Sequence, residues 1–332
     1  MTYEPDRVAR VLGDRAERGV SLSSYTTFRI GGPADFLLRP TVEAELVAIA
    51  EDLAGLDVTF LVVGQGSNLL VSDAGFRGVV IVLEATFARW THDGLVVEAG
   101  AAVKMPVLAR QSAHVGLRGL EWMVGVPGSV GGAVCMNAGG HGADVADNLI
   151  SAVVLDLRNG SVTLRAADTL ALSYRSSSLM PHEVVLRATF QCTAGHRETS
   201  EEEIASIVRW RRENQPGGAN CGSVFTNPPG DSAGRLIDAA GLRGFELGTA
   251  QVSPKHANFI QADEHATCVD VWALITAVRQ RVFETFSVDL HPEVRPVGFD
   301  GSLPPLRLPP SNLQTPGNTP THPHHPDAEG KP

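Results

Sequence analysis

Two glycine-rich segments carry the strongest chemical signal in this 332-residue chain. Residues 124–142, VGVPGSVGGAVCMNAGGHG, contain seven glycines, and GQGSN at 64–68 directly follows an apolar run. Glycine lacks a Cβ atom, so a ligand can approach the main chain closely and accept hydrogen bonds from successive N–H groups. A series of tight turns is the alternative for either segment alone. Because Gly-Lys-Ser/Thr and GxGxxG are absent at this junction, neither a P-loop nor a Rossmann site is indicated. Together the segments predict a ligand with a pyrophosphate and a long planar ring system.

The charge balance limits the classes of partner. The chain has 37 acidic and 27 basic side chains, a formal net charge of −10. Non-specific binding to nucleic acid needs a basic face, so this composition argues against it, whereas local arginines still allow an anionic substrate. The four cysteines show no CxxC or metal-ligand spacing and fit a reducing compartment. We expect a cytoplasmic protein without membrane insertion, nucleic-acid partner or metal, since neither a long apolar run nor a secretory signal is recognisable.

The N-terminal region alternates between strand and helix patterns. Residues 35–38, 59–63 and 79–83 read as short apolar strands. Residues 41–53 show helical spacing of apolar side chains, with Thr41 as the expected N-cap. The pattern predicts a small β-α-β unit. Its central strand, 59–63, reads as buried and ends in the glycine turn at 64–68.

Later regions combine strands with longer helices. The second region is expected to hold strands at 95–98, 152–157, 162–165 and 184–190 and a helix at 106–114, with Asn159-Gly160 in a hairpin turn. The third region is expected to hold helices at 200–214, 232–240 and 267–286 and strands near 252, 258–261 and 293–297. Ser200 and Glu203 have the spacing of a capping box for the first of these helices.

These patterns predict an α+β protein made of regions in series. We expect the divisions 1–88, 89–198 and 199–299, with the first two forming one ligand-binding unit. Residues 300–332 are rich in proline and include His322, His324 and His325. That composition is typical of a disordered tail, and we place it outside the site.

Seven segments resemble a known family in the order in which they occur along the chain. The family is UDP-N-acetylenolpyruvoylglucosamine reductase, the flavoenzymes of cytoplasmic peptidoglycan-precursor synthesis. The resemblance covers about Thr26 to Val297. The segments that carry it are TTFRIGGPADF (26–36), VGQGSNLLV (63–71), GVPGSVGGAVCMNAGGHG (125–142), YRSSSL (174–179), CGSVFTNP (221–228), SPKHANFI (253–260) and HPEVRPVG (291–298).

The resemblance implies a fold and a cofactor. The fold is a two-part FAD-binding module of the vanillyl-alcohol-oxidase (PCMH) type, followed by a C-terminal α+β substrate domain. The cofactor is non-covalent FAD, with NADPH as co-substrate, and the short segment after Arg175 resembles the compact branch that lacks an extra substrate-closing loop. The implied FAD contacts are Gly64, Gln65, Gly66, Ser67, Asn68, Leu69, Gly125, Pro127, Gly128, Ser129, Gly131, Gly132, Ala133 and Asn137.

The resemblance also implies a reaction, the NADPH-dependent reduction of UDP-N-acetylglucosamine enolpyruvate to UDP-N-acetylmuramate. Negative charge develops on the α-carbon and carboxylate of the substrate, so the site needs a fixed cation, a hydrogen-bonding acid and a proton donor. Arg175 matches the cation, Glu293 the acid and Ser223 the proton donor. Tyr174, Asn227 and Lys255 are the implied contacts to the UDP-sugar.

Some positions depart from the family pattern. Gln65 replaces a glycine in the turn, which is tolerable if its φ stays negative, and Asn214 occupies a position where a phosphate-binding lysine is expected. His141 reads as a surface-loop histidine, not as a covalent flavin attachment. Two other functions remain open: a flavin oxidase of the same fold, and a catalytically idle flavin-binding paralogue.

Overall fold

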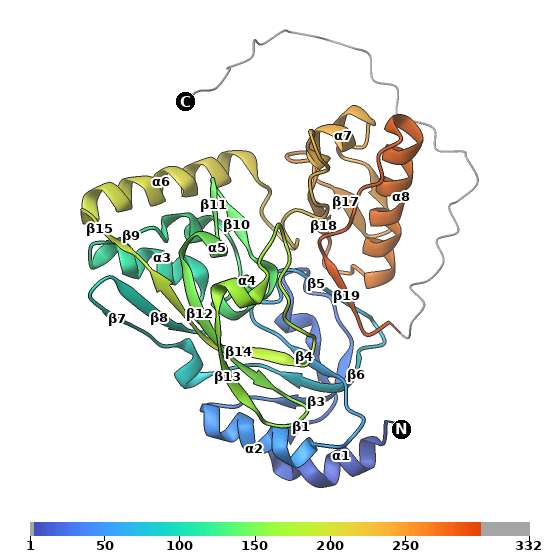
Figure 1. Ribbon diagram of the computed structural model, residues 1–332. Coiled ribbons are helices and arrows are strands. Elements are labelled where there is room, and N and C mark those ends of the chain that lie inside the picture. The colour runs from blue at the N-terminus through green and yellow to red at the C-terminus, as the bar shows by residue number, and fades with distance from the viewer. Residues whose placement is uncertain (1–2, 300–332) are drawn as a thin grey trace.

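The computed structural model describes residues 3–299, which form an α+β protein as predicted. Two five-stranded sheets lie next to each other and share one core, while a smaller sheet and two helices form a lobe beside them (Figure 1). The predicted tail at 300–332 lies outside the described residues. None of the helices in the described part of the chain is long and apolar enough to cross a membrane.

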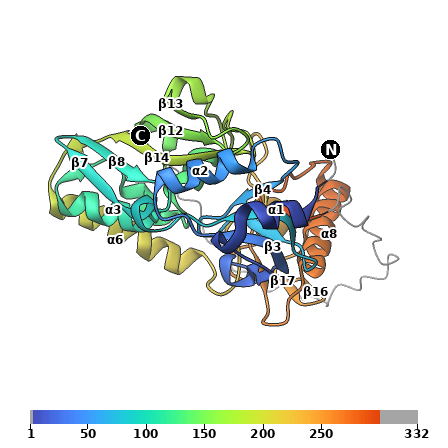
Figure 2. The ribbon, with the colours of Figure 1, turned by 90° about the horizontal axis from the view of Figure 1, so that it is seen from below.

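The first sheet contains the predicted β-α-β unit. Its strands are β1 (Ala16–Glu17), β2 (Val20–Ser21), β3 (Pro33–Leu38), β4 (Phe60–Val62) and β6 (Phe76–Ile81), in the order β1-β3-β6-β4, with β2 also paired to β3. Helices α1 (Pro5–Leu12) and α2 (Glu43–Leu53) cover one face of it, toward the viewer in Figure 2.

Two details of this unit were predicted wrongly. Strand β4 is a half-buried edge strand rather than a buried central one, since β3 and β4 both pair with β6 in parallel and residues 60–63 line a cavity. Thr41 does not cap α2, because its N–H and hydroxyl donate to Glu45 Oε2 and the helix begins at Glu43.

The second sheet is antiparallel throughout. Its strands are β7 (Trp90–Asp93), β8 (Val96–Gly100), β12 (Leu149–Asp156), β13 (Val162–Ala166) and β14 (Glu183–Gln191), in the order β13-β12-β14-β8-β7. The predicted hairpin is confirmed, since Leu155 pairs with Val162 across the Asn159-Gly160 turn. Strand β13 is therefore an edge strand.

Part of the long glycine segment is helical. Helix α4 (Val130–Met136) begins inside it, although glycine is a poor helix former. Tertiary packing overrides that propensity: a Cβ atom at Gly131 would lie 2.8 Å from Cβ of Ala101, so only glycine lets α4 pack this closely. The N–H of Gly131 donates to the main-chain oxygen of Ala101. Gly131 is therefore required for this close packing.

Helices α3 (Met105–His114) and α6 (Arg197–Asn214) pack together beside the second sheet. Helix α6, grouped from sequence with the third region, buries Ile204 and Ile207 in the core shared by the first two regions. The predicted capping box is wrong because α6 begins three residues before Ser200, whose hydroxyl donates to buried Glu121 at 2.6 Å.

The C-terminal lobe has its own core. It contains the sheet β16 (Glu246–Leu247), β17 (Ala250–Val252) and β18 (Ile260–Ala262), with helices α7 (Ala233–Ala239) and α8 (Cys268–Phe286). Ser232 and Thr267 cap the two helices. Strand β19 (Arg295–Val297) then returns to pair in parallel with β5 (Leu69–Val71), directly after the glycine turn. This pairing ties the lobe to the first region.

Candidate active site

A cavity of about 1020 Å³ lies where the two glycine segments meet the C-terminal lobe. This volume is at the upper end of the usual range for small-molecule sites, about 300–1000 Å³. Most residues predicted from sequence line it: Gly64, Gln65, Gly66, Ser67, Asn68, Leu69, Gly125, Pro127, Gly128, Ser129, Gly131, Gly132, Ala133, Arg175, Ser223, Asn227 and Glu293. Segments far apart in the sequence are thus brought to one cavity.

The two glycine segments contact each other directly. Ser67 Oγ donates to the main-chain oxygen of Pro127 at 3.1 Å. Gln65 has a negative φ, so the turn accepts this residue in place of glycine, as expected. Gly66 is needed for packing, because a Cβ there would lie 1.9 Å from the carbonyl oxygen of Tyr25. Gly132 differs, since its nearest protein atom, Ser129 Oγ, would be 3.6 Å from an added Cβ. Open space at Gly132 therefore belongs to the cavity.

Arg175 lies at the tip of a tight turn. Ser173 and Ser176 exchange two main-chain hydrogen bonds of 3.0 Å, which leaves Tyr174 and Arg175 as a two-residue loop. Arg175 has φ +56°, in the left-handed region that favours glycine. Such a conformation costs of order 1–3 kcal/mol in a non-glycine residue and persists only where the surroundings enforce it. The chain accepts this strain at the predicted catalytic cation.

The guanidinium of Arg175 faces Glu293. Arg175 Nε lies 2.9 Å from Glu293 Oε1, an ion-pair distance, but the buried Nε–H makes no hydrogen bond to any described residue. Its Nη2 donates to the main-chain oxygen of Gly139 at 3.0 Å. Burial raises the pKa of Glu293, and nearby Arg175 only partly opposes this. The pair therefore offers an unused donor and a carboxyl group that holds its proton more tightly than usual.

Main-chain contacts place Glu293 beside Ser223. The N–H of Glu293 donates to the oxygen of Val224 at 2.7 Å, and Asn68 Nδ2 donates to the oxygen of Glu293 at 3.0 Å. Ser223 is exposed on the cavity wall after Gly222, whose φ is +80°. Its hydroxyl makes no hydrogen bond within residues 3–299 and is available to a ligand.

Three predicted contacts do not line the cavity: Asn137, Tyr174 and Lys255. Asn137 is buried, with 2% of the residue exposed, and its side chain is fully engaged: Nδ2 donates to Asp144 and to the main-chain oxygen of Ser173, while Oδ1 accepts from the N–H of Ala146. It supports the start of the Arg175 turn.

The other two side chains lie away from the cavity wall. The ring of Tyr174 is exposed and lies 5.1 Å from the Arg175 guanidinium carbon. Lys255 Nζ donates to the main-chain oxygen of Arg212 at 2.5 Å. Asn214 also bonds within the protein, its Nδ2 donating to Trp210 O.

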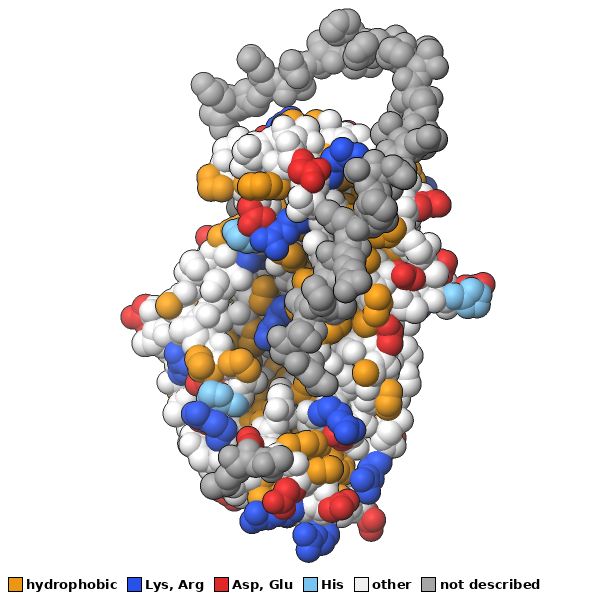
Figure 3. Space-filling view, turned by 90° about the vertical axis from the view of Figure 1, so that its right-hand side faces the viewer, with side chains coloured by type: hydrophobic (Ala, Val, Ile, Leu, Met, Phe, Trp, Pro, Cys, Tyr) orange, Lys and Arg blue, Asp and Glu red, His pale blue; other side chains and the backbone are white. Residues whose placement is uncertain are grey.

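Sequence reasoning missed a set of cations in the cavity. Lys104, Arg211 and Arg295 line it, and none has a carboxylate partner among residues 3–299. The cavity carboxylates Glu84, Glu183 and Glu293 are all paired with arginines. Elsewhere, on the face in Figure 3, basic and acidic side chains are interspersed. The excess positive charge faces the cavity, which suits an anionic ligand despite the net charge of −10.

His141 and Trp210 form an aromatic contact at the cavity. Their ring centroids are 5.3 Å apart in an edge-to-face arrangement, and the His141 ring packs against Gly125, where an added Cβ would lie 2.4 Å from Cδ2. Burial and the nearby charge of Arg211 lower the pKa of His141. His141 is exposed, as expected of a loop histidine, but it also lines the cavity. No signal in the sequence linked it to Trp210.

These features fit a bound dinucleotide cofactor. The cavity combines glycine main chain, the open space at Gly132, the unused Arg175 donor and excess cations. Residues 34–164 match the model of an FAD-binding domain, and residues 214–297 match the C-terminal domain of UDP-N-acetylenolpyruvoylglucosamine reductase. Fold, cavity and matches together define an FAD-binding oxidoreductase.

Individual relatives agree over most of the chain. UDP-N-acetylenolpyruvoylglucosamine reductases from Heliobacterium modesticaldum and Rubrobacter xylanophilus are 42% and 43% identical, covering 84% and 83% of this chain and 90% and 93% of their own. The crystal structure of the Thermus caldophilus reductase superposes with a TM-score of 0.74 at 36% identity, covering 85% of this chain and 99% of that one. The chain belongs to the UDP-N-acetylenolpyruvoylglucosamine reductase family.

Proposed function

We propose that this chain reduces UDP-N-acetylglucosamine enolpyruvate to UDP-N-acetylmuramate with NADPH, through bound FAD, in the cytoplasmic synthesis of peptidoglycan precursors. The observation that carries the proposal is the meeting of Arg175, Glu293 and Ser223 on the wall of one cavity with both glycine segments. A flavin oxidase of the same fold would have no use for this set of side chains. An idle paralogue remains an outcome of the experiment below.

The side chains divide the work of stabilising negative charge on the substrate. When bound and reduced by NADPH, FAD would supply a hydride to the β-carbon of the enolpyruvyl group. Arg175, with its unused Nε–H, holds the carboxylate of that group. Burial raises the pKa of Glu293, which favours its neutral form, and in that form the carboxyl donates a hydrogen bond to the developing enolate. Ser223 gives its hydroxyl proton to the α-carbon.

The same cavity accounts for recognition of the nucleotide ligands. Both NADPH and the UDP-sugar carry a diphosphate, and the unpaired cations Lys104, Arg211 and Arg295 supply matching charge. Asn227 lines the cavity as a substrate contact, and its Oδ1 accepts from the N–H of Ala233 at 3.0 Å, which fixes its orientation. We propose that the side-chain amide of Asn227 contacts the UDP-sugar.

An anaerobic absorbance experiment on the holoenzyme tests the function. The protein is reduced with NADPH, and UDP-N-acetylglucosamine enolpyruvate is then added without oxygen. Prompt return of the oxidised flavin spectrum with formation of UDP-N-acetylmuramate is expected. A spectrum that stays reduced would refute the proposal. Admission of air would then separate the alternatives, because rapid reoxidation is typical of an oxidase and slow reoxidation of an idle paralogue.

A further inference from the structure

The segment that follows the Arg175 turn has to cross to strand β14. It runs through residues 176–182, and Leu179, Met180 and Pro181 on it line the cavity. Its first part is anchored to α4, since Ser177 Oγ donates to the main-chain oxygen of Cys135 at 2.7 Å. Ser178 N–H donates to Leu170 O at 2.8 Å. The position of the turn therefore depends on what holds this segment.

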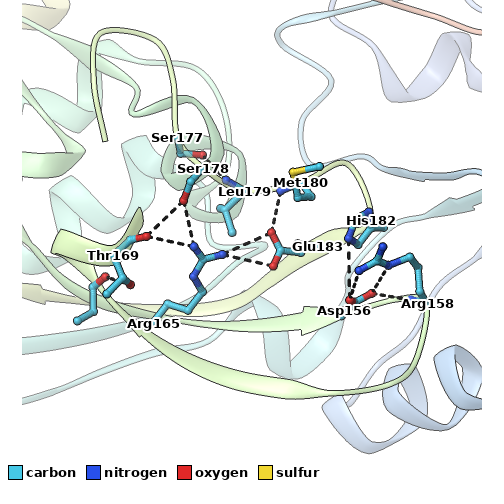
Figure 4. A network of polar contacts seen from close by, with 11 residues as sticks. Asp156, Arg158, Arg165, Thr169, Ser177, Ser178, Leu179, Met180, His182 and Glu183 are labelled. Carbon is cyan, nitrogen blue, oxygen red and sulfur yellow. Dashed lines mark hydrogen bonds and ion pairs between the residues drawn. The ribbon is translucent and has the colours of Figure 1, made fainter. Parts of the chain in front are cut away.

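Arg165 on β13 is the centre of that support (Figure 4). Its Nη1 lies 3.3 and 3.4 Å from the two carboxylate oxygens of Glu183, and its Nη2 donates to Ser178 Oγ at 3.0 Å and to Thr169 O at 3.1 Å. Glu183 Oε2 in turn accepts from the N–H of Met180 at 2.7 Å. One guanidinium thus bonds to the segment directly at Ser178 and indirectly, through Glu183, at Met180.

The burial of Arg165 fits this role. The other residues of β13 are exposed, whereas the Arg165 side chain is 21% exposed and that of Glu183 is 19% exposed. Charge-assisted hydrogen bonds are stronger in such partly dehydrated surroundings. Arg165 does not line the cavity, so it cannot touch a ligand there. Arg165 can therefore affect the reaction only through residues 176–180, which it holds in place.

We propose that Arg165 is a positioning residue for Arg175, which it keeps opposite Glu293 by fixing residues 176–180 through Ser178 and Glu183. The strained φ of +56° at Arg175 needs such external support, because a released turn would relax toward a less costly conformation. The role assigned to Arg175 rests on the proposed function. The support that Arg165 gives to residues 176–180 is independent of that function.

Arg165→Gln tests the fixing of the segment without any substrate. Arg158→Ala is the matched control, because Arg158 pairs with Asp156 on the same hairpin, within the same view, but does not bond to residues 176–180 (Figure 4). Amide hydrogen exchange of the holoenzyme should accelerate in peptides covering residues 173–181 in Arg165→Gln and remain unchanged there in Arg158→Ala. Equal exchange in both variants would overturn the proposal.

Two nucleotide-sugars test whether the effect reaches Arg175. UDP-N-acetylmuramate carries a carboxylate for Arg175, whereas UDP-N-acetylglucosamine has none. In titration calorimetry of the holoenzyme, Arg165→Gln should lower the affinity for UDP-N-acetylmuramate by about tenfold and leave the affinity for UDP-N-acetylglucosamine unchanged. Equal weakening of both would overturn the link to Arg175. If the wild-type protein fails to distinguish the two ligands, the proposed function fails, while the hydrogen-exchange result still decides the structural part.

A double-mutant cycle completes the test. If Arg165 acts through Arg175, Arg165→Gln should slow reduction of the enolpyruvyl substrate by about ten- to a hundredfold in the wild-type background and add little to Arg175→Lys. Independent, additive losses would contradict the proposal. Arg165→Lys keeps the charge but not the fork and should show most of the defect, and flavin content and melting temperature verify that each variant is folded.

Discussion

Arg175 Nε and Glu293 Oε1 lie 2.9 Å apart, although Arg175 lies beside the second sheet and Glu293 lies in the segment that follows the helices of the C-terminal lobe. Arg175 is carried by a turn beside the second sheet, and Glu293 lies two residues before the start of β19, the strand that ties the C-terminal lobe to the first region. The pair therefore exists only when the lobe is docked. Asn68 of the glycine turn bonds to the main chain of Glu293, so cofactor site and acid are held in one arrangement.

Removal of the Ser223 hydroxyl should separate the two half-reactions. Ser223→Ala should bind FAD and be reduced by NADPH at the wild-type rate, because its side chain bonds to no other described residue and supports no structure. Reduction of the enolpyruvyl substrate should slow by about 10²–10⁴-fold, the usual contribution of a positioned acid. Stopped-flow absorbance follows each half-reaction. Thr226→Ala on the same loop is the control, and an unchanged substrate rate in Ser223→Ala would remove Ser223 from the mechanism.

Arg175→Lys should keep the charge but lose the function. A lysine ammonium cannot reproduce a planar fork that reaches Gly139 O and Glu293 while leaving a donor for the substrate. We expect a fall in the substrate half-reaction of about a hundredfold or more, comparable to the loss of one preorganised donor. Presteady-state rates measure it. Near-normal turnover would show that only the positive charge of this residue matters.

Glu293 should make stability depend on pH. Burial raises its pKa in the folded state above the ordinary 4.5, so between pH 4.5 and the raised value the folded protein binds more protons than the unfolded one. Stability from this group is complete below pH 4.5 and is lost as the pH rises through the folded pKa. Glu293→Gln should therefore gain stability relative to the wild type as the pH rises above 4.5. Urea unfolding of both holoenzymes at pH 4 and 8 checks this, and a difference that does not change with pH would contradict it.

Local patterns predicted those elements whose determinants are local. The Asn159-Gly160 hairpin follows from neighbours in sequence and was found as expected, and the helices predicted at 232–240 and 267–286 are observed as α7 and α8. Thr41 and Ser200 were predicted to cap helices, but their hydroxyls donate to Glu45 and to buried Glu121 instead. A capping pattern cannot reveal such a competing partner, which for Ser200 lies far away along the chain.

The site was predictable in its motifs and not in its charges. The resemblance brought together Arg175, Ser223 and Glu293, whose convergence no spacing rule would give. Unpaired cations such as Arg211 were missed because nothing in a sequence tells an arginine facing a cavity from one in a surface ion pair. Asn137 is the opposite case. Its motif predicted a contact to the cofactor, but its side-chain amide donates to the main-chain oxygen of Ser173.

Gly132 and Gly131 are adjacent glycines of α4 that should respond oppositely to alanine. In Gly132→Ala the new methyl meets protein only at 3.6 Å and projects into the cavity, so the apoprotein should gain up to about 1 kcal/mol from helix propensity while FAD affinity falls by about tenfold or more. In Gly131→Ala the methyl would lie 2.8 Å from Ala101 Cβ, which should destabilise the apoprotein by about 1–3 kcal/mol. Urea unfolding of apoprotein and flavin titration measure both quantities. Unchanged FAD affinity in Gly132→Ala would place the cofactor away from this helix.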